Sequence, residues 1–119
     1  MFISGGNGVQ SRNKWRLVPQ GNGYYSLVSF LGGGNSLALD ITGEKNANGT
    51  NVEIYDYTGN DAQQFKIEKR GSGYILKTKV SGEKSCVEIA DADTGNGGNV
   101  QQWEINGNSC QIWIFEKVE

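Results

Sequence analysis

The sequence contains no histidine, only one proline, and no long run of apolar residues. Histidine is the commonest general base and metal ligand in proteins, so its absence disfavours both catalysis and a metal site. No stretch approaches the roughly 20 consecutive apolar residues of a membrane-spanning helix. An apolar N-terminal segment of the secretory type is also missing, so we expect any export signal to lie outside this chain. The charges are scattered and sum to −2, which leaves no basic face for a nucleic acid.

What is abundant is glycine, with 18 residues among 119, accompanied by many asparagines. Both residue types tolerate the positive φ angles of tight turns. Aromatic residues make up 10% of the chain and are spread along its length, which is unusual in a disordered protein. No apolar pattern with helical spacing persists. The composition therefore predicts a single, turn-rich, all-β domain.

An internal repeat organises the chain. Residues 48–65 align with residues 96–113 at a constant offset of 48, and the alignment extends upstream to Leu39-Asp40-Ile41 over Val87-Glu88-Ile89. Residues 13–17 match the tail of this unit, although only twelve residues precede them. We therefore expect one domain over 1–119 with a shortened first repeat at 1–20 and full repeats at 21–70 and 71–119.

Each full repeat is predicted to contain four strands separated by Gly/Asn turns, and the tail brings the expected total to about nine. Alternation along the third strand places Val52 and Ile54 inside, with Glu53 and Tyr55 outside. The predicted strands are Tyr24–Phe30, Leu37–Ile41, Val52–Tyr57 and Gln63–Glu68 in the first full repeat, and Tyr74–Lys79, Cys86–Ala90, Val100–Ile105 and Gln111–Lys117 in the second.

These residues resemble the ricin-type β-trefoil lectins, and most closely the bacterial carbohydrate-binding modules of family 13. The Gln-x-Trp hallmark of that family stands here as Gln63-x-Phe65 and Gln111-x-Trp113, with a degenerate Asn13-x-Trp15 in the tail. The resemblance implies a β-trefoil, a barrel with pseudo-threefold symmetry whose core is shared by three repeats. Since the first repeat is short, three explanations stay open: an incomplete unit, a fragment of a longer protein, or a homo-oligomer in which another copy completes the barrel.

The resemblance also implies sugar sites made of an outward aromatic ring, a carboxylate and a glutamine, and it implies neither a catalytic residue nor a cofactor. An aromatic face packs under the C–H groups of a sugar, and polar groups fix the orientation of its hydroxyls. The hallmark aromatics are expected in the core, and the two glutamines are expected to brace the backbone, with sugar contact as the alternative. Carried over by position, the carbohydrate-binding candidates are Asp40, Glu53, Tyr55 and Gln63 in the first full repeat, and Glu88, Gln101, Trp103 and Gln111 in the second.

Two departures weaken this transfer. The family often has asparagine immediately before the hallmark glutamine, where this chain has Ala62 and Cys110. Glu88 is one methylene longer than the usual aspartate, which favours the first site over the second. We therefore carry two hypotheses: a non-catalytic lectin module for a glycan or plant polysaccharide, such as an accessory module of a glycoside hydrolase, and a trefoil scaffold that binds a protein instead.

The two cysteines occupy matched positions in the repeat. Cys86 and Cys110 correspond to Ala38 and Ala62 at the same offset of 48, which suggests that the two sites are neighbours in space. The pattern favours a disulfide, worth roughly 3 kcal/mol on the chain-entropy estimate, over two separate buried thiols. A disulfide would fit an extracellular location, which is the one we expect.

Overall fold

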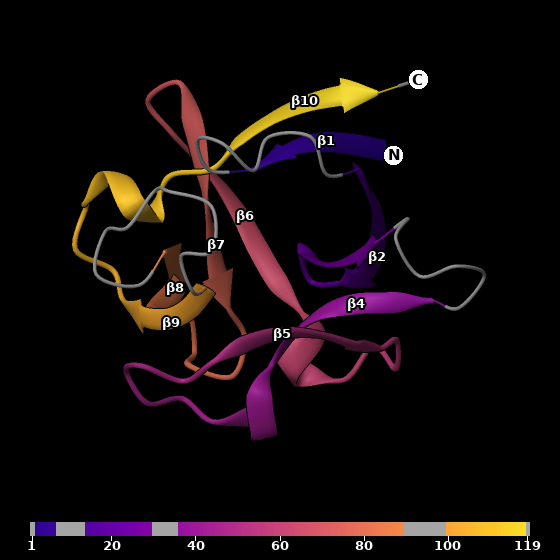
Figure 1. Cartoon of the computed structure of the whole chain (residues 1–119), viewed down its shortest axis with the longest axis horizontal. Helices are drawn as coiled ribbons and strands as arrows, with labels where there is room; N and C mark the ends of the chain where they lie inside the picture. The colour runs from indigo at the N-terminus through magenta and orange to yellow at the C-terminus, as the bar shows by residue number, and fades with distance from the viewer. Residues whose placement is uncertain (1, 7–13, 30–35, 90–99, 119) are drawn as a thin grey trace.

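The computed structural model describes residues 2–6, 14–29, 36–89 and 100–118 (Figure 1). Short strands and 3-10 turns make up the secondary structure of these residues, as the Gly-rich composition predicts. The strands are β1 (Phe2–Gly6), β2 (Lys14–Gly21), β3 (Tyr24–Ser29), β4 (Leu37–Ile41), β5 (Val52–Asp56), β6 (Phe65–Arg70), β7 (Gly73–Thr78), β8 (Ser85–Ile89), β9 (Val100–Glu104) and β10 (Ile114–Val118), and the 3-10 turns are η3 (Thr42–Glu44), η4 (Asp61–Gln63) and η6 (Ser109–Gln111).

A closed ring of antiparallel strands forms the body of the molecule. Strands pair in the order β10-β1-β2-β3-β6-β7, and a bridge between Tyr74 and Trp113 joins β7 back to the residue before β10. The two backbone hydrogen bonds of this bridge are both 2.8 Å long. Glycine is required beside the bridge, because a Cβ atom on Gly73 would lie 2.8 Å from the carbonyl oxygen of Trp113. The ring therefore closes within one chain, and no second copy is needed to complete it.

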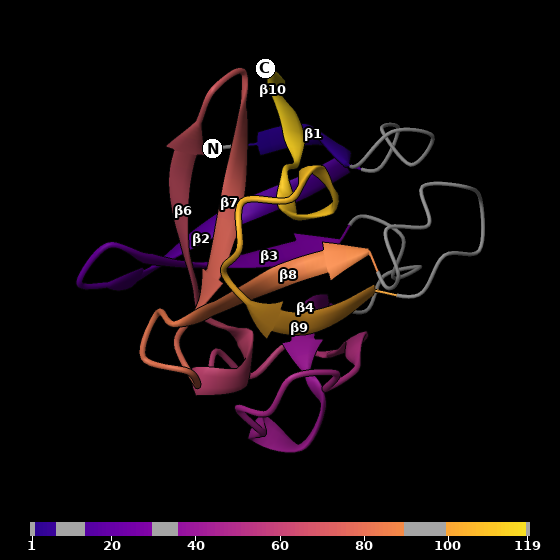
Figure 2. The ribbon, with the colours of Figure 1, turned by 90° about the vertical axis from the view of Figure 1, so that its left-hand side faces the viewer.

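Two hairpins, β4–β5 and β8–β9, are attached to the ring. Their registers are equivalent at the repeat offset, since Asp40 lies opposite Glu53 and Glu88 lies opposite Gln101. In both views the β4–β5 hairpin lies at the end of the molecule opposite the two chain termini (Figures 1 and 2). The fold is a β-trefoil, as the sequence predicts.

The hallmark aromatics lie in the core, which confirms their predicted place. Phe65 is fully buried, and Trp15 and Trp113 are 8% and 6% exposed. The indole N–H of Trp113 donates a 2.9 Å hydrogen bond to the carbonyl oxygen of Val87, so the polar atom of this ring is satisfied inside the core. These rings pack with leucine, isoleucine and valine side chains from the ring strands and from both hairpins.

Three details of the strand prediction are wrong. Strand β1 was not predicted, so the described residues contain ten strands rather than nine. The hallmark glutamines Gln63 and Gln111 lie in 3-10 turns that precede strands, not in the strands themselves. Ile54, expected inside, is 42% exposed. Predicted residues Phe30 and Ala90 fall outside the described residues.

No helix among the residues that the structure describes has the length and apolar character needed to cross a membrane.

Candidate functional site

The four candidate residues of the first full repeat meet at one open hollow of about 400 Å³. Strand pairing explains this convergence: Asp40 on β4 lies opposite Glu53 on β5, and Tyr55 follows two residues later on the same face. Gln63 reaches the hollow from η4. The hollow is lined by Asp40, Gly43, Glu44, Glu53, Tyr55, Thr58, Asn60, Ala62 and Gln63.

Gln63 braces the hollow from behind. Its side chain is fully buried, and its carbonyl Oε1 accepts hydrogen bonds of 2.8 Å from the Thr58 N–H and 3.0 Å from the Gly59 N–H. Gly59 has a positive φ in this turn, a conformation that glycine adopts without steric cost. Its amide Nε2 donates to the Asp56 carbonyl oxygen and to Asp40 Oδ2, both at 2.8 Å. Because the donors and acceptors of Gln63 are all used, this residue positions the site and has no free group for a ligand.

Only one carboxylate oxygen of Asp40 has a partner among the described residues. The residue is 7% exposed, and Gln63 holds its Oδ2, while no described residue bonds to Oδ1. Glu44 and Glu53 line the same hollow and make no hydrogen bond or ion pair within the described part of the chain. Tyr55 is 57% exposed, so its ring is available to a ligand from solvent. The hollow thus combines an open aromatic ring with unpaired carboxylates.

The second full repeat reproduces the glutamine brace. Gln111 is fully buried, and its Oε1 accepts a hydrogen bond of 3.1 Å from the Asn106 N–H. Its Nε2 donates to the Glu104 carbonyl oxygen at 2.9 Å and to Glu88 Oε1 at 3.0 Å. Each of these partners lies 48 residues beyond its counterpart in the first repeat.

The carboxylate of the second repeat is fully engaged by the protein. Gln101 Nε2 donates a 2.8 Å hydrogen bond to Glu88 Oε2, and Oε1 accepts from Gln111 and from the Cys110 thiol, whose Sγ lies 3.8 Å away. Trp103 beside it is partly exposed. The structure therefore brings the four second-repeat candidates together, but it leaves no carboxylate oxygen of Glu88 without a partner.

The predicted disulfide is wrong, because Cys86 and Cys110 are both free and buried. The repeat correctly suggests that the two residues are close, but the Cys110 thiol points at the Glu88 carboxylate instead of forming a bond to Cys86. Burial, with the nearby Glu88 and Cys110 adding to it, raises the pKa of Cys86 to about 12. Burial and the charge of Glu88 likewise raise the pKa of Cys110.

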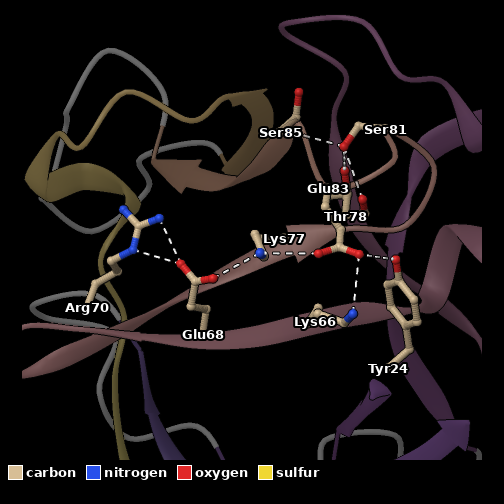
Figure 3. Close-up of polar contacts among 9 residues, drawn as sticks. All are labelled: Tyr24, Lys66, Glu68, Arg70, Lys77, Thr78, Ser81, Glu83 and Ser85. Carbon is tan, nitrogen blue, oxygen red and sulfur yellow. Dashed lines mark hydrogen bonds and ion pairs between the residues drawn. The ribbon is translucent and has the colours of Figure 1, made fainter. Parts of the chain in front are cut away.

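A second polar cluster, on β6, β7 and the turn after β7, differs from the hollow in that its acids are paired (Figure 3). Glu68 accepts from Arg70 at 2.7 Å and from Lys77 at 2.9 Å. Glu83 lies 3.2 Å from Lys77 and accepts a 2.9 Å hydrogen bond from the Tyr24 hydroxyl. The hydrogen bonds from Tyr24 and Lys77 hold the pKa of Glu83 below its ordinary value. These carboxylates have protein partners, as expected of a structural network.

The sequence interpretation missed four residues that line the hollow: Gly43, Glu44, Thr58 and Asn60. They belong to the turns after β4 and β5, where the family motif gives no position to carry over. Thr58 and Asn60 do have counterparts in Asn106 and Asn108 at the repeat offset, and in both repeats the earlier side chain accepts a hydrogen bond from the later N–H. This shared turn was the available signal.

The chain matches a known protein family. The profile of the ricin-type beta-trefoil lectin domain-like family matches residues 11–103 and 61–119. None of the curated proteins matches the chain by sequence comparison.

Several solved structures are similar to this chain. The designed threefold-symmetric protein ThreeFoil is 35% identical, with a TM-score of 0.79 over 93% of this chain and 75% of that chain. An exo-β-1,3-galactanase from Clostridium thermocellum is 28% identical, with a TM-score of 0.79 over 88% of this chain but 22% of the enzyme. The Polyporus squamosus lectin, solved with a human-type influenza-binding epitope, has the same fold at 22% identity and a TM-score of 0.76, over 98% of this chain and 48% of the lectin.

Proposed function

This chain belongs to the ricin-type β-trefoil lectin domain-like family, and we propose that it is a non-catalytic carbohydrate-binding module of the family 13 type. Its main site is the hollow on the β4–β5 hairpin. The observation that carries the proposal is the exposed ring of Tyr55 beside Asp40, a buried carboxylate with one oxygen unpaired.

The chemistry of this hollow suits a sugar ring. An aromatic face gains apolar contact with the C–H groups of a sugar at little side-chain entropy cost. A carboxylate oxygen accepts hydrogen bonds from sugar hydroxyls, and charge-assisted bonds of this kind are stronger than neutral ones. We assign the ring contact to Tyr55 and the hydroxyl contacts to Asp40 and Glu53. Gln63 acts as a positioning residue, because its own polar atoms already have partners.

The unpaired charge of the hollow narrows the ligand class. Asp40, Glu44 and Glu53 all line it, and none of them makes an ion pair with a described basic residue. An acidic saccharide would bring a like charge into this site, which is unfavourable. We therefore expect neutral or amino sugars to bind in preference to uronic or sialic acids.

The second-repeat site is the weaker one in this proposal. Gln101, Gln111 and Cys110 occupy the carboxylate of Glu88, so a sugar there would have to break protein hydrogen bonds to gain its own. This arrangement favours the alternative of a trefoil scaffold without sugar binding for the second hairpin alone. Trp103, as a partly exposed ring, would then give only apolar contact.

Residues 1–20, we infer, form a first repeat that lacks its hairpin. Strand β1 pairs with β10 as β7 pairs with β6, and β2 pairs with β3 as β6 pairs with β7. Residues 30–64 lie between β3 and β6 and residues 79–113 between β7 and β10, whereas only residues 7–13 lie between β1 and β2. The ring strands of the first repeat are thus accounted for without a hairpin between them.

A glycan array that contains neutral, amino and acidic saccharides tests the proposed function. We expect Tyr55→Ala to lower the affinity for the best saccharide at least tenfold, about 1.4 kcal/mol. The matched variant Trp103→Ala removes the equivalent ring of the other hairpin and should change that affinity less than twofold. Binding that survives Tyr55→Ala unchanged, in a protein whose circular dichroism is unaltered, would remove this site from the proposal.

A further inference from the structure

The outer edges of the two hairpins are equivalent by repeat, but the described residues cover only one of them. On β9, the Gln102 N–H donates to the Thr50 carbonyl oxygen, and the Gln102 carbonyl oxygen accepts from the Gly49 N–H, both at 2.8 Å. The Glu104 N–H donates to Asn48 Oδ1 at 2.9 Å. Residues 48–50 therefore lie along β9 like an added strand, and Gln102 is fully buried.

None of the described residues covers the corresponding edge of β5 in this way. Ile54 is the counterpart of Gln102 at the repeat offset, and it lies opposite Leu39 as Gln102 lies opposite Val87. The Thr42 N–H donates to the Asn51 carbonyl oxygen, and the Tyr57 N–H donates to the Ser36 carbonyl oxygen. Thr42–Asn51 and Ser36–Tyr57 are therefore hydrogen-bonded pairs of the β4–β5 ladder. By antiparallel alternation, the N–H and C=O of Ile54 then point away from β4.

The open edge carries an exposed isoleucine and an exposed tyrosine, next to the exposed Asp56. Strand β5 pairs with β4 alone, and within the described part of the chain nothing bonds to the outward N–H and C=O of Ile54. The Ile54 side chain is 42% exposed and the neighbouring Tyr55 side chain is 57% exposed. Natural proteins usually protect such an edge, because it is a template for pairing with another strand.

The missing first-repeat hairpin explains the open edge. The segment that covers β9 belongs to the connection between β4 and β5, in the repeat that precedes β9. The repeat that precedes β5 is the first, and only residues 7–13 separate its two ring strands. Among the described residues, the first repeat therefore has no segment that corresponds to residues 48–50 of the second.

We propose that the outer edge of β5 pairs with β5 of a second copy of this chain, antiparallel and centred on Ile54. The strand is self-complementary in this register: Ile54 faces its own copy, Glu53 faces Tyr55, and Val52 faces Asp56, so no like charges are opposed. A twofold centred on Asp56 would instead bring two carboxylates together. The pairing adds main-chain hydrogen bonds and buries the exposed isoleucines against each other.

Twofold pairing also gives a closed dimer, the commonest symmetry of soluble homo-oligomers. Residues that lie opposite each other in an antiparallel pair project to the same face, so the Tyr55 rings of both copies would share one face. This last consequence rests on the proposed function, since two saccharide sites on one face would bind a multivalent glycan with higher avidity than one. The interface itself does not depend on sugar binding.

Disulfide trapping in the full chain tests the register without any saccharide. In a bonded antiparallel pair the facing Cα atoms are about 5.5 Å apart, a separation that a disulfide can span. We expect Ile54→Cys to give a covalent dimer on a non-reducing gel after mild oxidation. Ile114→Cys is the matched control, because Ile114 is 43% exposed on a strand of the ring; the native cysteines are buried and should not compete.

Light scattering after size-exclusion chromatography gives an independent readout. The unmodified chain should elute with the mass of two chains, Ile54→Arg should elute as a monomer with unchanged circular dichroism, and Ile114→Arg should remain a dimer. A monomeric unmodified chain at the highest soluble concentration would overturn the proposal. So would a dimer in which Ile54→Cys crosslinks no faster than Ile114→Cys. Neither measurement uses a glycan. A negative result in either would therefore count against the dimer and not against the proposed saccharide site.

Discussion

In the first hairpin Gln63 holds one oxygen of Asp40, and in the second hairpin Gln111 holds one oxygen of Glu88. Both backbone partners of Gln111, the Asn106 N–H and the Glu104 carbonyl oxygen, have counterparts 48 residues earlier in Thr58 and Asp56, and Gln63 accepts one more bond from the Gly59 N–H. The two sites differ at the second carboxylate oxygen. Oδ1 of Asp40 has no partner among the described residues, whereas Oε2 of Glu88 accepts a hydrogen bond from Gln101.

Two substitutions between the repeats account for this difference. Glutamate extends the carboxylate by one methylene, and glutamine at position 101 provides an amide donor where the first hairpin has the carboxylate of Glu53, which donates nothing when ionised. In the second hairpin, both carboxylate oxygens of Glu88 are therefore hydrogen-bonded within the protein. A scaffold of backbone and brace that both repeats share does not by itself make a binding site, because the site depends on which polar atoms have no protein partner.

The largest effect should come from removing the brace that both hairpins share. Gln63→Ala and Gln111→Ala each remove a fully buried side chain and all of its hydrogen bonds, and each should lower the free energy of unfolding by about 3 kcal/mol. Urea denaturation followed by tryptophan fluorescence measures this loss. Similar losses would show that the two braces are equivalent, and a loss confined to one variant would contradict the equivalence.

The next effect, on affinity, comes from converting the first hairpin into the second. The double variant Asp40→Glu with Glu53→Gln recreates the acid–amide pair of Glu88 and Gln101. If that pair closes the site, saccharide affinity should fall at least tenfold, about 1.4 kcal/mol, while stability stays near that of the unmodified chain. Titration calorimetry with the best array saccharide measures the change.

The reverse swap is the control for this conversion. Glu88→Asp with Gln101→Glu alters only the second hairpin, so affinity at the first hollow should stay unchanged. If both swaps weaken binding equally, the saccharide does not distinguish the hairpins, and the assignment of the main site to Tyr55 and Asp40 is wrong.

The sequence predicts most of the fold because the repeat carries so much of it. The offset of 48 makes β4 equivalent to β8 and β5 equivalent to β9. The Gln-x-aromatic spacing predicts Phe65 and Trp113 in the core, where the structure has them. It also predicts which four residues meet at each hairpin, because strand pairing repeats with the sequence. Strand β1 escaped prediction because residues 2–6 have no aligned copy elsewhere in the chain.

What the sequence could not predict depends on contacts between repeats. Ile54 follows the alternation of a core residue. It is exposed because none of the described residues covers it as residues 48–50 cover Gln102 in the next repeat. The cysteine spacing indicates proximity but not the direction of each thiol, and Glu88 captures one of them. Without the disulfide, the extracellular location stays a prediction from the family resemblance alone.

The smallest effect concerns the cysteines, which replace two alanines of the first hairpin. Cys110→Ala copies Ala62 and removes only a sulfur atom and its long contact with Glu88, so the free energy of unfolding should fall by about 1 kcal/mol or less. The reactivity of the two thiols gives a separate test. Because the thiolate is the reactive form, the raised pKa values of both thiols predict negligible reaction with a thiol reagent at pH 8 in the folded chain. Once urea unfolds the chain, two thiols should react, as counted by mass spectrometry. Fewer than two would mean that a disulfide forms after all, and rapid labelling before unfolding would mean that the β8–β9 hairpin is more open than its buried Glu88 implies.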